Sequence, residues 1–484
     1  MVNHGISFPT AADGSRPTSQ VAREVVAEAL RPVDPLGARA TEQETAWRSR
    51  YLLHLKRLVE AGLATPEAWQ QVAGAGLDAV RRRLVVSHPD GDRPLGSLAD
   101  APGARALETL TVTGDSEPLT ELVLPYRGQR LVGADLDAQL AAWEGAGVLE
   151  PSAAVAVREV AAHPEWLRLE GRTLAVLGAG AEMGPLGPLL RWGATVAAVD
   201  LPTPAIWERV LGTARAAAGR LLVPVSPGTE DAGVDLLAEV PETADWLAGL
   251  DGRLVVGNYL YADGGTHVRV SVAADVLASR VTAARPDTAV AFLATPTDVF
   301  AVPGVAVEAS GRAYDGRSGT AKLVGRPLRW ASRGRLLHRQ YPPQLDGWAD
   351  PGIADCLVPQ QGPNYALAKR IQRWRASVDR AAGRQVSFHV APSTRTRSVV
   401  KNRALAAAFA GAHRFGVEVF DPATSNTLMA ALLVHDLVAE QPTRAHPWQD
   451  EAHAAVHGGL WRAPYEPRSA LGLAAVLGYA SARG

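Results

Sequence analysis

Three glycines and a carboxylate in the middle of the chain have the types and spacing needed to hold a dinucleotide. The segment LAVLGAGAEMGPLGPLLRWGATVAAVD runs from one short apolar stretch through a glycine-rich turn to a second apolar stretch, which ends at Asp200. Glycines let the backbone approach a diphosphate, and the free N–H groups of the following helix face its charge. A carboxylate at Asp200 can bind both ribose hydroxyls and would repel a 2′-phosphate, so NAD is favoured over NADP. The loop residues predicted to contact this cofactor are Gly178, Gly180, Glu182, Met183 and Gly184.

A tyrosine and a lysine form a second candidate pair. In the segment Tyr365-Ala-Leu-Ala-Lys369 the two side chains are four residues apart and share one face of a predicted helix. A nearby ammonium lowers the pKa of a phenol, so Tyr365 could exchange a proton with an alcohol or carbonyl oxygen near neutral pH. The alternative is a buried tyrosine and a solvated lysine on an ordinary helix.

The elements that must position these residues follow from the alternation of short apolar runs with amphipathic runs after residue 172. This alternation is typical of a parallel sheet covered by helices on both faces. We therefore predict an α/β fold with a doubly wound parallel Rossmann sheet. The predicted strands are 174–177, 195–199, 220–225, 254–256, 289–294, 385–390 and 416–420.

The chain divides into three predicted parts. Residues 1–168 form a mostly helical α+β domain, residues 169–437 the Rossmann domain, and residues 438–484 a C-terminal tail or lid. A stretch rich in Gly, Pro, Arg and Trp, about 303–363, is predicted to be an insertion in the Rossmann domain. The elements predicted outside the Rossmann domain are helices within 21–86, over 135–143, from Pro151 onward and near 469–477, and a pair of strands over 107–112 and 122–126.

The glycine loop, the Tyr-x-x-x-Lys pair and the order of elements together resemble the short-chain dehydrogenase/reductase superfamily, in a divergent and enlarged form, over roughly residues 172–435. The resemblance implies that Tyr365 relays a proton and that Lys369 also holds the nicotinamide ribose. The family's serine at the end of the fifth strand is absent. We favour the hydroxyl of Thr295 in its place. The other candidate hydroxyls are Thr297, Ser310 and Ser318.

The same resemblance implies further cofactor contacts. Asn258 ends the fourth predicted strand, where the family has an Asn/Gly pair beside the cofactor. Thr394 or Thr396, in the loop after the sixth strand, would contact the nicotinamide carboxamide, although a hydroxyl that caps the next helix is the alternative. The sequence departs from the family at Leu186, where a further glycine is usual.

Residues 312–339 of the predicted insertion carry eight cations against one acid, Asp315. Such a cluster could clamp the carboxylate or phosphate of an anionic small-molecule substrate. A solvated arm, or a contact between subunits of a homo-oligomer, is the alternative. The eight cations are Arg312, Arg317, Lys322, Arg326, Arg329, Arg333, Arg335 and Arg339.

Two other groups in the sequence have side chains that could bind a metal or form a disulfide. His453 and His457 are spaced to share a helical face, which is half of a zinc site, but no third ligand is evident and no metal is predicted. Cys356 is the single cysteine, so no disulfide can form within the chain, and a reducing cytoplasm is expected.

Bulk composition excludes several function classes. The formal net charge of −1 gives no field that would attract nucleic acid. No signal peptide and no apolar window long enough to cross a membrane is present, so neither secretion nor membrane insertion is expected. The excess of Arg over Lys is typical of a bacterial genome rich in G and C.

The leading hypothesis is an NAD(H)-dependent oxidoreductase that interconverts an alcohol and a carbonyl. One alternative keeps the cofactor but uses it transiently, as a dehydratase, epimerase or other lyase does. A second alternative is a non-catalytic nucleotide-binding protein. The glycine loop itself could instead be a structural turn, or hold another adenine ligand such as S-adenosylmethionine.

Overall fold

The fold is taken from a computed structural model, which describes residues 5–319, 323, 327–330, 332–333, 335–343 and 350–481. Lys322 and Arg326 of the predicted cation cluster lie outside the described residues. Within them, no helix is long and apolar enough to cross a membrane.

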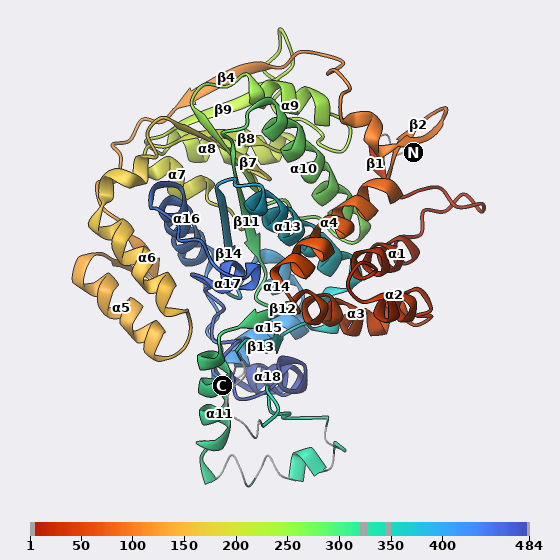
Figure 1. The fold of residues 1–484 in the computed structure, drawn as a ribbon. Coiled ribbons are helices and arrows are strands. Elements are labelled where there is room, and N and C mark those ends of the chain that lie inside the picture. The colour runs from red at the N-terminus through yellow and green to blue at the C-terminus, as the bar shows by residue number, and fades with distance from the viewer. Residues whose placement is uncertain are drawn as a thin grey trace.

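A twisted sheet forms the centre of the molecule (Figure 1). In the described residues its strands lie in the order β14-β11-β10-β7-β8-β9-β4, and all neighbours are parallel except β4 and β9. The six parallel strands thus follow the doubly wound order 3-2-1-4-5-6, which is that of a Rossmann fold. The strands are β4 (Glu108–Thr113), β7 (Arg172–Leu177), β8 (Thr195–Val199), β9 (Arg220–Val225), β10 (Arg253–Asn258), β11 (Ala289–Ala294) and β14 (Val386–Val390).

Helices cover both faces of this sheet, as apolar runs buried on two sides require. On one face lie α7 (Leu186–Arg191), α8 (Pro204–Arg215) and α16 (Pro422–Val438). On the other lie α9 (Val240–Ala248), α10 (Gly265–Ala284) and α13 (Pro363–Ala381). Successive residues of β7 alternate between the two apolar cores, which confirms the predicted fold class.

The prediction of a strand over 416–420 is wrong. The N–H groups of Glu418 and Phe420 donate to the carbonyls of Gly458 and Ser393, so no continuous ladder forms. Phe420 instead packs its ring against Tyr126 and Trp143. An apolar alternation of five residues did not distinguish a strand from this loop.

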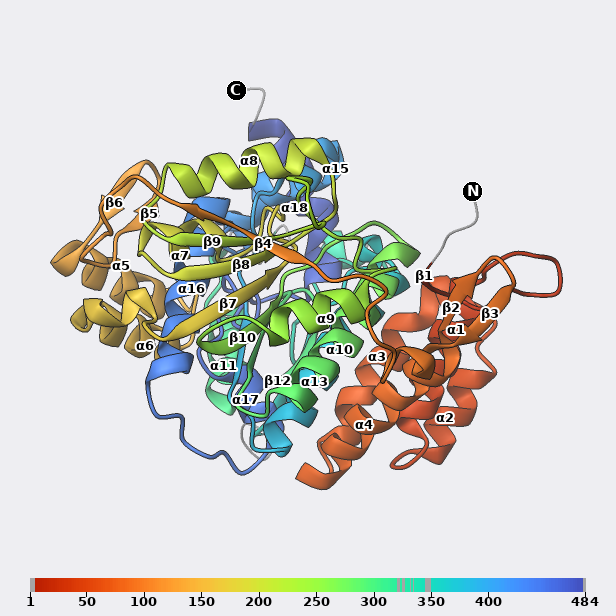
Figure 2. The same cartoon turned by 90° about the horizontal axis from the view of Figure 1, so that it is seen from above.

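The N-terminal segment packs on both sides of the sheet (Figure 2). Helices α1 (Thr18–Leu30), α3 (Trp47–Gly62) and α4 (Pro66–Arg83) share an apolar core with α10 and α13, and α2 (Pro35–Glu42) packs on α1. Helix α6 (Pro151–Ala162), with α5 (Gly133–Gly145) beside it, packs against α16 on the opposite face. The short elements here are β1 (Gly5–Ser7), β2 (Val85–His88), β3 (Gly91–Pro94), η1 (Leu95–Leu98) and η2 (Pro164–Arg168).

The expected pairing of 107–112 with 122–126 is wrong. Strand β4 pairs with β9 at the edge of the central sheet, whereas β5 (Leu124–Tyr126) pairs with β6 (Gln129–Leu131). Arg127 and Gly128, both with positive φ, form the two-residue turn of this hairpin. The division of the chain at residue 168 stays a prediction, although β4 belongs to the same sheet as β7.

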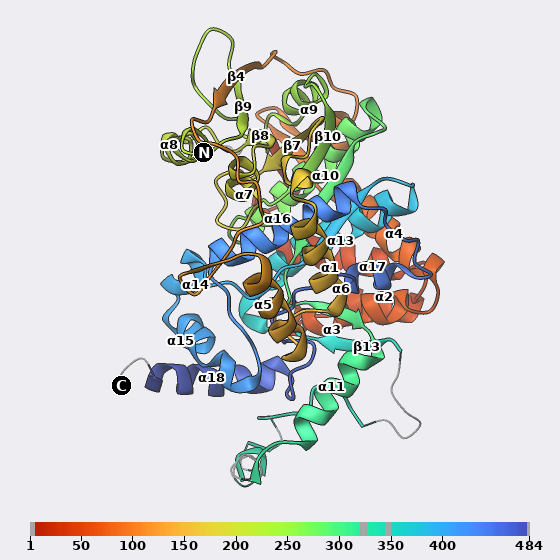
Figure 3. The ribbon, with the colours of Figure 1, turned by 90° about the vertical axis from the view of Figure 1, so that its left-hand side faces the viewer.

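The later segments extend from the end of the sheet, where α11 and α18 project (Figure 3). Strand β12 (Val299–Val302) pairs with β13 (Gly352–Asp355), and α11 (Gly304–Asp315) follows β12. The remaining described elements are η3 (Pro359–Gln361), α14 (Arg397–Lys401), α15 (Arg403–Gly411), η4 (Ala412–Phe415), α17 (Pro447–Ala452) and α18 (Pro467–Ser481).

Close packing of α4 on α13 gives a test of this architecture. A Cβ at Gly76 would lie 2.6 Å from an indole carbon of Trp374 on α13, whereas a Cβ at Gly74 would meet nothing within 4 Å. We expect Gly76→Ala to destabilise the protein by about 1–3 kcal/mol through overpacking. Gly74→Ala should be neutral or stabilise by up to about 1 kcal/mol, because alanine favours a helix. Thermal melting of both variants is the measurement, and equal melting temperatures would contradict this packing.

Candidate active site

The carboxyl ends of β7, β10 and β11 meet at one edge of the sheet. Leu177 at the end of β7 pairs in register with Asn258 at the end of β10, and β11 follows on the far side. Helix α7 leaves β7 toward one face and α10 leaves β10 toward the other, so the chain diverges between these strands. In open α/β sheets such a switch point is where ligands bind.

The glycine loop begins with a turn that only glycine makes without strain. Gly178 has a φ of +84°, and a Cβ there would lie 3.1 Å from the Tyr259 carbonyl oxygen. A Cβ at Gly180 would lie 2.7 Å from Ile206 and 3.1 Å from the Asp200 carboxylate. Gly184 is different, because a Cβ there would make only ordinary contacts with Tyr259. Two of the three glycines are therefore required by close approach of the protein itself.

Asp200 lies beside this loop, as expected from the spacing. Its Oδ2 accepts a hydrogen bond from the Gly180 N–H at 2.7 Å, and its Oδ1 accepts one from the Leu201 N–H at 2.8 Å. Arg209 of α8 donates to the Gly180 carbonyl at 2.6 Å. Each carboxylate oxygen keeps a second lone pair, so Asp200 can still accept from a ligand hydroxyl.

The far half of the loop is held by a residue that the sequence analysis missed. The amide of Asn426, on α16, accepts from the Gly184 N–H at 3.1 Å and donates to the Glu182 carbonyl at 2.8 Å. The Glu182 carboxylate accepts from the Arg397 N–H at 2.7 Å, and Met183 packs against the core on this face. No spacing rule links Asn426 to a loop that lies more than 240 residues earlier.

Tyr365 and Thr295 come together across the sheet edge. Tyr365 stands in the first turn of α13, and its hydroxyl makes a hydrogen bond with that of Thr295, just after β11. Thr295 in turn bonds to Thr297, hydroxyl to hydroxyl, at 2.8 Å, and the Gln361 amide donates to Thr297 at 2.6 Å. Of the candidate hydroxyls, Thr295 is thus the one placed against the tyrosine.

The pKa of Tyr365 departs from expectation. Burial raises it to about 12, while the hydrogen bond with Thr295 lowers it by less. The expected lowering by a neighbouring ammonium is wrong, because Lys369 turns elsewhere. Its Nζ donates to the Leu293 carbonyl at 3.1 Å and to Gln372 at 3.2 Å. At neutral pH the phenol is therefore protonated.

Lys369 connects to the end of β10 through a glutamine. Gln372, one turn further along α13, accepts from the ammonium through its amide oxygen and donates to Asn258 at 3.5 Å. Burial lowers the pKa of Lys369 to about 8. Asn258 also accepts from the Leu260 N–H at 3.2 Å, which fixes its side chain at the strand end.

An aromatic wall beside Tyr365 contains a buried imidazole that the sequence analysis missed. The His267 ring, on α10, lies 5.3 Å from the Tyr365 ring, and Tyr261 lies 5.3 Å from His267. Burial, reinforced by the charge of Lys369, lowers the pKa of His267 to about 3. The imidazole is therefore neutral, and it adds no charge beside the phenol.

The remaining predicted site residues are engaged elsewhere. Thr394 is buried and bonds to Ser425 at 2.7 Å, and Thr396 bonds to Ser398 at 2.9 Å. Ser310 donates to the Ala463 carbonyl at 2.6 Å, which ties α11 to the C-terminal segment. None of these hydrogen bonds reaches Tyr365, Thr295 or Thr297.

Several arginines of the predicted cation cluster form internal contacts. Arg317 lies over the Tyr314 ring at 3.4 Å and donates to Tyr465, and Arg329 donates to the Tyr314 hydroxyl. Arg339 pairs with Asp315 at 3.2 Å. These contacts join the insertion to the C-terminal segment, and its role in binding an anion stays a prediction.

His453 and His457 do not share a helical face, because α17 ends at Ala452 and the chain then turns. His457 bonds to Glu150 at 3.0 Å, and burial lowers the pKa of His453 to about 4. Cys356 is fully buried, which raises the pKa of its thiol.

Comparison with known proteins yields little. No family model and no curated protein matches the chain. Two solved structures, titled "Structure of A-type Ketoreductases from Modular Polyketide Synthase" and "Structure of A1-type ketoreductase", match with TM-scores of 0.31 and 0.32 at 14% identity. Each match covers 58% of this chain and 52% of the other, about half its length. At this similarity the match adds nothing to the fold that the strand order itself shows.

The depressed pKa of Lys369 gives a pH-dependent test. Between about pH 8 and the ordinary lysine value of 10.5, the unfolded chain holds this proton more tightly than the folded chain, so stability rises with pH. We expect the free energy of unfolding of the wild type, relative to Lys369→Met, to rise across this window by on the order of 1–3 kcal/mol. Urea denaturation at several pH values measures it, and a flat difference would show that the ammonium is solvated.

Proposed function

We propose that this chain is a nicotinamide-dependent oxidoreductase of the short-chain dehydrogenase/reductase type, which reduces a carbonyl compound to an alcohol with NADH. The observation that carries the proposal is the Tyr365–Thr295 hydroxyl pair at the carboxyl edge of the Rossmann sheet. That pair lies at the same edge as the glycine loop and Asp200. A proton donor and a nucleotide loop at one switch point fit this reaction class.

The residues at the loop fit a dinucleotide. Gly178 and Gly180 let the loop turn tightly against Tyr259 and Asp200, and Gly184, where a Cβ would make only ordinary contacts, leaves the backbone open to a diphosphate. Asp200 has oxygen lone pairs left for the adenine ribose hydroxyls, and its charge disfavours a 2′-phosphate. Asn258 and Lys369 would face the nicotinamide end, since both lie at the strand edge near Tyr365. When bound, the cofactor supplies the hydride.

The protein's own residues supply the proton. Because the pKa of Tyr365 is about 12, its phenol is protonated at neutral pH and can donate to the carbonyl oxygen as negative charge develops there. When substrate binds, the Thr295 hydroxyl would turn its one proton from the Tyr365 oxygen to the same carbonyl oxygen and orient the substrate. The hydride adds to carbon and the phenolic proton to oxygen, which completes an alcohol.

The first test separates proton transfer from binding. Tyr365→Phe should lower carbonyl reduction, followed as NADH consumption across a panel of ketones and aldehydes, by at least about 100-fold, because the proton donor is lost. Binding of NADH, measured by fluorescence, should change little.

Tyr126 offers a matched control. Its pKa is also raised to about 12, and its hydroxyl bonds to Glu418 at 2.7 Å, not to Tyr365 or Thr295. Tyr126→Phe removes a similar buried phenol and should keep activity. If Tyr365→Phe retained full carbonyl reduction, Tyr365 would not be the proton donor. A wild-type chain that binds NADH but reduces no carbonyl compound would instead be a nucleotide-binding protein without this chemistry. Turnover of a substrate without net NADH consumption would instead favour a lyase or epimerase.

The second test addresses the cofactor. Asp200→Asn keeps the shape of the side chain but removes the charge, so we expect NADH to bind about tenfold more weakly and NADPH to lose less or gain. Glu208→Gln is the control, because Glu208 is an exposed carboxylate on the neighbouring α8. Fluorescence titration with both nucleotides gives the ratio. An unchanged preference would remove Asp200 from the cofactor site.

A further inference from the structure

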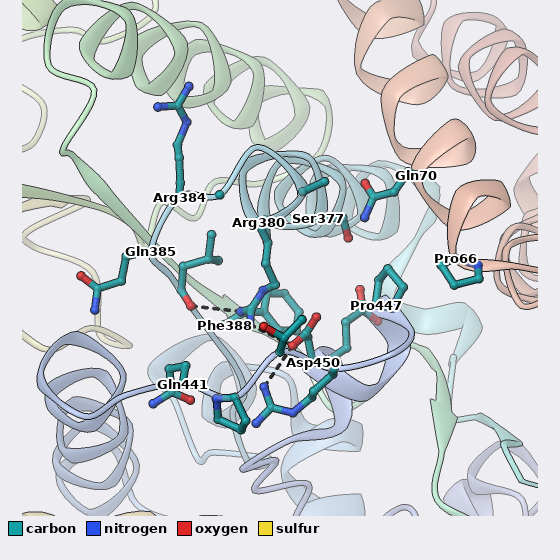
Figure 4. Close-up of a pocket in the computed structure, with 18 of the residues that line it drawn as sticks. Pro66, Gln70, Ser377, Arg380, Arg384, Gln385, Phe388, Gln441, Pro447 and Asp450 are labelled. Atoms are coloured by element: carbon teal, nitrogen blue, oxygen red, sulfur yellow. Dashed lines mark hydrogen bonds and ion pairs between the residues drawn. The ribbon is translucent and has the colours of Figure 1, made fainter.

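A cavity lies at the amino ends of the parallel strands, opposite the end that carries the glycine loop. It has a volume of about 1010 Å³ and opens at the amino ends of β7, β10 and β14. Its walls come from the last turns of α13, the first turns of α4, and the segment that joins α16 to α17 (Figure 4). Small-molecule sites in proteins have cavities of this size.

Two arginines in this cavity lack a counter-charge. Arg172 begins β7 and Arg253 begins β10, and the two are register partners on adjacent parallel strands, so they lie side by side. Arg172 donates to the Leu437 carbonyl at 2.5 Å and to Gln385 at 3.4 Å, and Arg253 donates to the Asp287 carbonyl at 3.1 Å. Among the described residues, no carboxylate forms an ion pair with either guanidinium.

The electrostatics of the pair agree with this geometry. Burial, and then the like charge of Arg253, lowers the pKa of Arg172. Arg172 is half-buried whereas Arg253 is exposed, so the desolvation cost of an unpaired charge falls on Arg172. Two adjacent guanidiniums without a carboxylate are thus the arrangement that an anion would complete.

The other arginines of the cavity wall share carboxylates, so their positive charge is only partly neutralised. Arg380 and Arg444 both pair with one carboxylate, that of Asp450, each at 3.0 Å. Figure 4 shows Arg380 directed toward Asp450, with Arg384 directed away from it. Arg384 pairs with Asp379 at 3.2 Å, and Asp379 is shared with Arg375.

Three further acids line the cavity. Glu451 is bound by Arg373. Glu67 stands in the first turn of α4, where its own N–H and the Thr65 hydroxyl lower the pKa of its carboxyl. Glu440 lies on the loop after α16. None of the three forms an ion pair with Arg172 or Arg253, so the two arginines keep their charge available.

We propose that this amino-edge cavity binds a small anionic molecule that carries carboxylate or phosphate groups, held by Arg172 and Arg253. Planar guanidinium groups bind either anion with two parallel hydrogen bonds. The amides of Gln70 and Gln441 also line the cavity, and that of Gln441 bonds to His435 at 3.4 Å. The site is separate from the cofactor loop, since it lies at the other end of the strands.

The test is calorimetric titration of the full chain, in one arm with citrate and in the other with inorganic phosphate. We expect saturable binding with a Kd below about 1 mM in at least one arm. The arm that binds identifies the ligand as a polycarboxylate or a phosphate compound. Arg172→Gln and Arg253→Gln should each weaken it about tenfold, and Arg172→Lys less, because the charge is kept.

Arg220→Gln is the matched control. Arg220 begins β9 at the same edge of the sheet, is exposed, and lies outside the cavity. Its loss should leave anion binding unchanged, and NADH titration of all variants should be unchanged as well. Absence of binding up to about 10 mM in both arms would overturn the proposal. The proposal would also be overturned if Arg253→Gln, at an exposed position, bound the anion as strongly as the wild type does.

Discussion

A fully enclosed carboxylate fixes the geometry on which the candidate site depends. Asp298 follows the turn after β11, and α13 holds it through Arg370 at 2.8 Å and Arg373 at 2.7 Å. Arg373 also binds Glu451 of α17. Burial raises the pKa of Asp298, but the two arginines outweigh it and keep the carboxyl ionised. Breaking such a buried pair typically costs about 3–5 kcal/mol, because it leaves an uncompensated charge.

This ion-pair cluster explains how a hydroxyl and a phenol from distant segments meet. Thr295 lies three residues before Asp298, and Tyr365 lies five residues before Arg370 on α13. The ion pairs that hold Asp298 to α13 therefore also keep Thr295 beside Tyr365. The predicted insertion lies between these two residues in the chain. The ion pairs of Asp298 with Arg370 and Arg373 join the segments before and after it, so the contact does not depend on the insertion.

Helix α13 connects this site with the rest of the molecule. Its first turn carries Tyr365, its middle is buried under α4 and α10, and its last turns line the amino-edge cavity. The helix runs from the carboxyl ends of the strands to their amino ends, as the connection between parallel strands requires. The proposed cofactor site and the proposed anion site therefore lie at its opposite ends.

The sequence by itself determined the local elements and their class. Six of the seven predicted Rossmann strands are confirmed within a few residues, since apolar runs bounded by Gly and Pro have a strong local signal. The glycine turn and Asp200 were found for the same reason, because the βαβ unit that brings them together is local. The false strand at 416–420 shows the limit, where alternation without a neighbouring strand gives only a loop.

Only the tertiary structure decided which distant groups meet. His267, Gln372 and Asn426 carry no motif, and each acquires its position from packing between helices far apart in the chain. The protonation state of Tyr365 was likewise beyond the sequence, because spacing places a lysine on the same helical face but does not say where its ammonium points. Lys369 bonds to a carbonyl and a glutamine, so burial, and not a neighbouring charge, sets the pKa of the phenol.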